Sequence, residues 1–184
     1  MVPGLIVLGI VAVIILWFIA AYNGLVRARN NVRNAWSQID VQLKRRHDLI
    51  PNLVEVVKDY MGYEQEVLTN VTKARNVAVA ARGPAEAATA EAGLSRALTG
   101  LYAVMENYPD LKANQNVSQL QEELTSTENK IAFARQYYND SVMVYNTRIE
   151  VIPTNIVANM CSFQKAEFFQ APEEEKAVPR VDLR

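Results

Sequence analysis

The order of apolar and polar positions divides the chain into one uninterrupted apolar run and a longer part with helical periodicity. The run extends from Leu5 to Tyr22, and no charged side chain occurs before Arg27. Its 18 residues would span about 27 Å as a helix, close to the thickness of the bilayer hydrocarbon core. Trp17 and Tyr22 lie toward one end, as interfacial aromatic residues do. The pattern predicts a transmembrane anchor over residues 5–24.

A cleaved signal peptide is the alternative interpretation of this run, and it fits less well. A positive n-region is missing, the apolar run is too long, and no A-x-A cleavage site follows it. Basic residues flank only the C-terminal side, at Arg27, Arg29 and Arg33. The positive-inside rule then predicts a single pass, with residues 1–4 outside and the soluble part in the cytoplasm. For a bacterium, this places the chain in the inner (cytoplasmic) membrane or an organelle membrane.

Beyond the anchor, apolar residues recur every three or four positions, as they do on one face of a helix. The pattern predicts long outer helices over about 25–61 and 117–151, with two shorter helices between them. Pro51 is expected to kink or briefly break the first helix. A turn at Gly62 would give four helices and a continuous helix would give three; we favour four. Arg82-Gly83-Pro84 predicts a loop, and Ser118 with Gln121 indicates a capping box.

The expected fold class is therefore all-α, since no stretch alternates with period two for long enough to suggest a strand. We predict a single N-terminal transmembrane helix followed by an antiparallel, up-and-down four-helix bundle with long, coiled-coil-like helices. The bundle occupies residues 25–152. Residues 153–184 form an apolar segment and a C-terminal tail, in which Glu173-Glu174-Glu175 is expected to be solvated.

The composition of the chain excludes several classes of function. Nineteen basic and twenty acidic residues give a net charge of −1, so no global field favours nucleic acid. The single cysteine, Cys161, excludes an internal disulfide, and the single histidine, His47, excludes a multi-histidine metal centre. No dinucleotide, phosphate-loop, zinc-protease or serine-hydrolase motif is present. The sequence predicts no enzymatic activity, no cofactor and no metal site, although separate helices can still assemble a carboxylate site.

A long segment carries a family resemblance. The stretch Trp36–Leu53 (WSQIDVQLKRRHDLIPNL) resembles the signature of the LemA family of bacterial membrane proteins, and shorter matching pieces follow in order. They are Tyr22-Asn23, Ala74-Arg75, Ala134–Asn139, Tyr145-Asn146, Ala166–Phe169 and Val178-Pro179. The resemblance implies one N-terminal transmembrane helix, a cytosolic antiparallel four-helix bundle and no established enzymatic activity. One branch is associated with magnetosome membranes, which implies a role in organising or shaping membrane.

Several polar residues are candidates for contacts. Gln38, Arg45 and Asn52 repeat every seven residues and so share one helix face, which is either a partner-binding face or a solvated surface. Asn139 and Asn146 lie one heptad apart, and we expect them to fix helix register. His47 is expected to be a hydrogen-bonded structural residue near Pro51.

Two groups of residues are candidates for contact with the membrane. Arg27, Arg29 and Arg33 lie within about two helical turns of the membrane, where each can gain on the order of 1 kcal/mol against anionic headgroups. An antiparallel four-helix arrangement also returns the chain to the membrane after Pro153. The apolar residues there are predicted to pack at the membrane-proximal base, in the interface or against another subunit: Ile156, Val157, Met160, Phe163, Phe168 and Phe169.

The expected function is that of a non-enzymatic membrane scaffold or adaptor acting through its cytosolic helices. One alternative is a homo-oligomeric, membrane-shaping or magnetosome-like organelle biogenesis protein. Another is a regulatory partner of a second envelope protein. The expected partners are membrane lipid and either a further copy of the chain or another membrane protein, with no nucleic acid.

Overall fold

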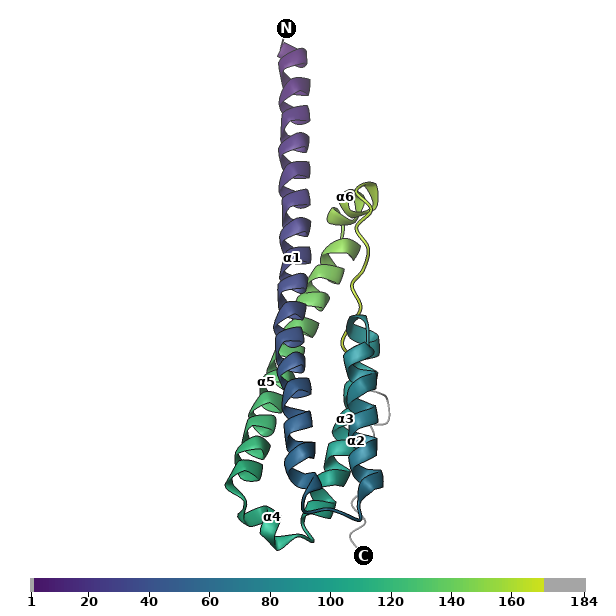
Figure 1. Cartoon of the computed structure of the whole chain (residues 1–184). Helices are drawn as coiled ribbons and strands as arrows, with labels where there is room; N and C mark the ends of the chain where they lie inside the picture. The colour runs from purple at the N-terminus through teal and green to yellow at the C-terminus, as the bar shows by residue number, and fades with distance from the viewer. Residues whose placement is uncertain (1, 171–184) are drawn as a thin grey trace, which may run out of the picture. The chain divides into compact units, whose positions relative to one another are not determined.

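The computed structural model describes residues 2–170, and within them the structure is all-helical, without strands. The six helices of this part of the chain are α1 (Val2–Lys58), α2 (Gln65–Ala80), α3 (Gly83–Met105), α4 (Pro109–Ala113), α5 (Gln115–Glu150) and α6 (Thr154–Met160) (Figure 1). The acidic run at residues 173–175 lies outside the described residues.

Helix α1 joins two elements that the sequence suggested as separate. It continues without a break from the apolar run to Lys58, and Pro51 lies inside it. The expected break at Pro51 is therefore absent. The helix ends four residues before Gly62, and α2 begins only at Gln65, so the first helix does not continue through this region.

The described residues form two compact units, and both α1 and α5 contribute to each of them. Unit 1 contains residues 2–37 and 136–167, and unit 2 contains residues 38–135 and 168–170. In unit 2, one buried apolar cluster draws on α1 through Ile50, Leu53 and Val57, and on α2 through Leu68 and Val71. It continues through buried residues of α3, α4 and α5: Leu94, Leu98, Leu101, Met105, Leu111, Val117 and Leu124. Burial of these side chains is the main driving force for assembling the unit.

In unit 1, the buried residues of α1 begin where the apolar run ends. Residues 3–17 of α1 are exposed, whereas Ala21 and Leu25 are buried. From there, buried positions alternate between three and four residues apart, which places them on one helix face. They are Ala21, Leu25, Ala28, Val32 and Ala35 on α1, and Tyr138, Val142, Tyr145 and Ile149 on α5. The apolar run thus extends beyond the packed part of this unit.

Two helix starts differ from the sequence-based expectation. Helix α3 begins at Gly83, whose positive φ of 77° a glycine tolerates, and Glu86 accepts a hydrogen bond from the main-chain N–H of Arg82. Helix α5 begins at Gln115, and its cap is Asn114, whose Oδ1 accepts hydrogen bonds from the N–H groups of Asn116 and Val117 at 2.9 and 3.4 Å. The capping box expected at Ser118 was wrong because Asn114 caps the helix one turn earlier.

Candidate functional site

A buried ion pair joins α1 to α3 inside unit 2. Nη1 of Arg46 donates a hydrogen bond to Oε2 of Glu91 at 3.1 Å, and Nε2 of His47 lies 2.6 Å from Oε1 of the same carboxylate. The residues are 4% (Arg46), 6% (Glu91) and 8% (His47) exposed. A buried charge without a partner costs several kcal/mol in lost hydration. The three groups therefore depend on one another.

Further polar groups surround Arg46. Nη2 of Arg46 donates to Oγ of Ser95 at 2.8 Å, and it lies 3.7 Å from Oε1 of Glu128. The charges of Arg46 and Glu128 also act on the hydroxyl of Tyr102. Burial raises the pKa of Tyr102, the Arg46 guanidinium lowers it and the Glu128 carboxylate adds to the rise, so the net direction is upward.

The local sequence explains why long polar side chains fit here. Arg46 and His47 lie three and four residues after Leu43 and point to the same buried face of α1. On α3, Glu91 is surrounded by buried alanines. Ala88 and Ala92 line a space of about 160 Å³ next to Arg46 and Glu91. Small side chains on α3 thus leave room for the polar groups of α1.

Pro51 places a second polar contact on α1. A proline has no N–H, so the carbonyl of His47, four residues earlier, lacks its usual helical donor. Nε of Arg75 on α2 donates to that carbonyl at 2.8 Å. Arg75 thus satisfies an acceptor that Pro51 leaves open. The expectation that His47 is a hydrogen-bonded residue near Pro51 is confirmed, through both its ring and its carbonyl.

The chemistry available to this polar cluster (Arg46, His47, Arg75, Glu91 and Ser95) is limited. With Glu91 ionised, Nε2 of His47 carries the proton of their hydrogen bond, because a carboxylate only accepts. The Ser95 hydroxyl oxygen accepts from Arg46. Each of these contacts holds two helices together. Among the described residues, no group of three His, Cys, Asp or Glu side chains has the arrangement of a metal site.

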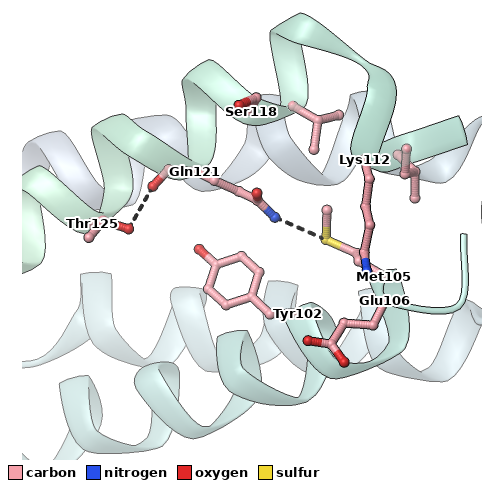
Figure 2. Close-up of a pocket in the computed structure, with 9 residues that line it drawn as sticks. Tyr102, Met105, Glu106, Lys112, Ser118, Gln121 and Thr125 are labelled. Carbon is pink, nitrogen blue, oxygen red and sulfur yellow. Dashed lines mark hydrogen bonds between the residues drawn. The ribbon is translucent and has the colours of Figure 1, made fainter. Parts of the chain in front are cut away.

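A larger pocket of about 380 Å³ lies elsewhere in unit 2. Figure 2 shows the side chains of Tyr102 and Gln121 at this pocket, with Nε2 of Gln121 directed to the sulfur of Met105 at 4.0 Å. Glu106 and Lys112 also line it. Its lining mixes apolar and polar groups without a concentrated charge of one sign.

Unit 1 contains a hydrogen-bonded clamp on the extended segment after α6. Tyr138 and Tyr145 on α5 donate from their hydroxyls to the main-chain oxygens of Glu167 and Gln164 at 2.8 and 2.9 Å. Asn146 makes two hydrogen bonds to the main chain of Ala166, each 2.9 Å long. Residues 164–167 therefore run antiparallel to α5. Asn146 makes these contacts with main chain, and Asn139 is half-buried.

The other end of the same segment meets α1 where the apolar run ends. The rings of Phe163 and Tyr22 are 5.8 Å apart in an edge-to-face arrangement, and the guanidinium of Arg29 lies 5.0 Å from the centre of the Phe163 ring. Nη1 of Arg148 donates to the main-chain oxygen of Gly24 at 3.0 Å. These contacts fix α6 and the end of α5 to residues 22–29 of α1.

The polar residues that the sequence predicted as contact sites differ in how exposed their side chains are. Gln38, Arg45 and Asn52 are all exposed, and Nη2 of Arg45 makes an exposed contact with Oε2 of Glu123 at 3.5 Å. Arg27 and Arg33 are exposed, whereas Arg29 is half-buried against Phe163.

The apolar residues after Pro153 are likewise not equivalent. Ile156 and Met160 are exposed, whereas Val157 and Phe163 are buried in unit 1. Phe168 is half-buried, and Phe169 is buried in unit 2, where the guanidinium of Arg135 lies 5.7 Å from the centre of its ring.

Sequence reasoning missed Glu91 as the partner of Arg46 and His47. Position 91 lies 44 residues from His47, in an alanine-rich helix. The one available signal was a lone carboxylate among small residues on the face that also carries Leu94 and Leu98. Arg75 lay within the matching pieces, but its contact with the His47 carbonyl was not foreseen.

Together, the helices and the apolar run define the class of protein. Helix α1 has the length and composition to cross a membrane, with its apolar part almost entirely exposed, and the other regular elements of the described residues are helices. The protein is a membrane-associated, all-helical protein. The model of the LemA family matches residues 35–183, and the chain belongs to this family.

Named relatives agree with this assignment. The chain is 29% identical over 170 residues to Protein LemA of Metamycoplasma hominis, covering 90% of this chain and 74% of that protein. It is 26% identical over 175 residues to Magnetosome protein MamQ 2 of Paramagnetospirillum magneticum, covering 81% of this chain and 64% of that protein. It is 25% identical to Magnetosome protein MamQ of Magnetospirillum gryphiswaldense, with 80% and 64% covered. The aligned part thus spans less than two thirds of each of these two magnetosome proteins.

Proposed function

We propose that this protein is a non-enzymatic, single-pass membrane scaffold or adaptor that presents a cytosolic helical bundle to a partner. One observation carries the proposal. The single helix α1 contains both the exposed apolar run and the buried Arg46 and His47, which tie it to α3. A continuous helix that carries both would hold the packed residues of unit 2 to the same helix that enters the membrane.

In this proposal, the polar groups of unit 2 stabilise helix packing. The buried carboxylate of Glu91 pairs with Arg46 and His47, and Arg75 donates a hydrogen bond to the His47 carbonyl. Every one of these contacts links different helices, as an antiparallel four-helix bundle requires. The proposal assigns these residues no part in catalysis, since each described contact is already used to connect helices.

The proposed topology places the short N-terminus outside and the helical part in the cytoplasm of a bacterial inner membrane. Arg27 and Arg33, exposed just beyond the apolar run, support this orientation and would contact anionic headgroups. Tyr63, 98% exposed in the link between α1 and α2, offers a test. In a Cys161→Ser background, the Tyr63→Cys variant should react with a membrane-impermeant maleimide in inverted vesicles and not in intact spheroplasts. The reverse result would contradict the orientation.

The exposed face of Gln38, Arg45 and Asn52 is the proposed partner surface. The test is crosslinking in native membranes followed by mass spectrometry, with all three residues changed to alanine. As a matched control, Thr69, Thr72 and Asn76, which are exposed and three or four residues apart on α2, are changed to alanine instead. We expect partner crosslinks to be lost only in the first variant. If both variants keep every crosslink, this face is not the partner surface.

A second candidate function is membrane shaping by a homo-oligomer. The likeness to the two MamQ proteins, whose names place them with magnetosomes, favours it. Mass photometry of the detergent-extracted chain separates the two functions. A strictly monomeric chain at all concentrations would exclude the oligomeric coat and leave the adaptor.

A further inference from the structure

The region around α6 is uncharged and exposes several large apolar side chains beside the polar Asn159. No charged side chain occurs between Glu150 and Lys165. The side chains of Ile152, Ile156 and Met160 are 82%, 54% and 71% exposed. Ile156 and Met160 are four residues apart and share one face of α6. Apolar groups gathered on a surface in this way usually mark a contact with a membrane or a protein.

The opposite side of α6 is packed within unit 1. Val157 and Ala158 on α6 are fully buried, and Phe163 is buried just after the helix. The clamp formed by Tyr138, Tyr145 and Asn146 then holds the following segment on α5. The orientation of α6 is therefore fixed from behind, and its apolar face points away from the packed part of the unit.

The contacts of Phe163 set the depth of α6 relative to the anchor. Phe163 meets Tyr22, at the end of the apolar run, and Arg29, seven residues further along α1. Seven helical residues correspond to a rise of about 10 Å. The headgroup layer on each side of a bilayer is of similar depth, about 5–8 Å. Figure 1 agrees: α6 lies at the end of α5 that is nearer to the extended N-terminal part of α1.

We propose that α6 is a second membrane contact of this chain, in which Ile152, Ile156 and Met160 enter the boundary between headgroups and acyl chains. The proposal rests on the anchoring of the chain by α1. Lipid is the occupant because the surface adjoins, through Phe163 and Tyr22, the exposed apolar surface of the anchor. It also lacks the charges that a water-facing helix would carry. Short apolar segments held at a bilayer surface bind in this way.

The proposal separates residues that the sequence grouped together. Val157 and Phe163 pack against unit 1 and do not contact lipid. Phe168 and Phe169 belong to unit 2, and the proposal does not use them. The lipid-facing set is therefore Ile156 and Met160 together with Ile152, which precedes the helix and is the most exposed of the three.

The test uses the full chain in vesicles of phosphatidylcholine and phosphatidylglycerol. In a Cys161→Ser background, one cysteine is introduced by Ile156→Cys or Met160→Cys and labelled with a fluorophore sensitive to its surroundings. Phosphatidylcholine brominated along its acyl chains is the quencher. Leu16→Cys labels the anchor. Gln136→Cys labels an exposed position of unit 1, about 21 Å along α5 from Glu150 by helical rise.

We expect strong quenching of the probes at 16, 156 and 160, with the last two quenched at least about threefold more than the probe at 136, because quenching requires contact with acyl chains. Strong quenching at 16 with equal, weak quenching at 156, 160 and 136 would overturn the role of α6 and leave the anchor in place. Absence of quenching at 16 would overturn the anchoring itself. Disulfide formation between two copies of the unlabelled Ile156→Cys chain on mild oxidation by copper phenanthroline, with no quenching of the labelled chain, would assign the surface to a second copy and also overturn the proposal.

Discussion

His47 and Glu91 are 44 residues apart in the sequence, yet Nε2 of the first lies 2.6 Å from Oε1 of the second in a buried site. The other oxygen of the Glu91 carboxylate accepts from Arg46. One carboxylate thus bridges two neighbouring side chains of α1. Glu91 is therefore the carboxylate that pairs with both buried side chains of α1.

Replacing Glu91 by glutamine should therefore destabilise the protein strongly. The variant keeps the shape of the side chain but leaves the buried Arg46 guanidinium without its closest charge partner, which we expect to cost about 3–5 kcal/mol. Denaturant unfolding of the full chain in detergent, followed by circular dichroism, measures the loss. Glu123→Gln is the matched control, since its pair with Arg45 is exposed and is worth at most about 1 kcal/mol. Equal effects of the two changes would contradict this role.

The contact between Arg75 and the His47 carbonyl predicts non-additive behaviour. Arg75→Ala leaves a main-chain acceptor unpaired and should cost about 1–3 kcal/mol. Pro51→Ala supplies the missing N–H, so the same arginine change should then cost less. A double-mutant cycle of unfolding free energies measures the difference. If Arg75→Ala costs the same with proline and with alanine at position 51, the carbonyl is not what Arg75 stabilises.

Ionisation of the Tyr138 hydroxyl should lower the free energy of unfolding at high pH. Burial, helped by the Glu167 carboxylate, raises its pKa from 10.0 to about 12. The folded protein keeps this proton when the unfolded chain has lost it. The stabilisation is therefore fully present below pH 10 and is lost as the pH rises toward 12, amounting to roughly 1–3 kcal/mol. Tyr138→Phe should flatten this part of the stability profile, whereas Tyr137→Phe, at an exposed position, should not.

The clamp on residues 164–167 predicts local protection against proteolysis. Asn146→Ala removes both hydrogen bonds to Ala166, with an expected loss of about 1–3 kcal/mol for the docked segment. Trypsin should then cut after Lys165 at least about tenfold faster than in the native chain. Asn159→Ala, at an exposed position of α6, is the control. Unchanged cleavage after Lys165 in the Asn146 variant would show that the clamp does not hold the segment.

The spacing of apolar residues predicted much of the fold. The helical spacing predicts one shared face of the first helix, and six of its eight residues are buried, whereas Trp36 is half-buried and Tyr60 is 42% exposed; the six are Val32, Ile39, Leu43, Ile50, Leu53 and Val57. Such periodicity is local, so it can be read without knowing what the face meets. It does not reveal whether neighbouring elements join. Polarity changes near Asn23 while helix-forming residues continue, so the anchor and the first helix appeared separate although α1 is one helix.

The polar cluster was less accessible to such reasoning because its geometry depends on which helices pack together. Arg46 and His47 were visible, but their partner Glu91 lies on another helix, and no local pattern distinguishes it from the exposed glutamates. The segment after Pro153 shows the same limit. Composition marked it as apolar, and only the contacts of Phe163 with Tyr22 and Arg29 separate its packed residues from its exposed ones.

Pro51 also restricts how α2 can slide along α1. A shift of α2 along α1 by one helical turn would move its side chains by about 5.4 Å. The missing N–H at Pro51 marks a single carbonyl, at His47, as needing an outside donor, and Arg75 is the residue that reaches it. A shifted α2 would carry Arg75 away from that oxygen and leave it unpaired. The missing N–H of Pro51 thus favours the one alignment of α1 and α2 in which Arg75 reaches the His47 carbonyl.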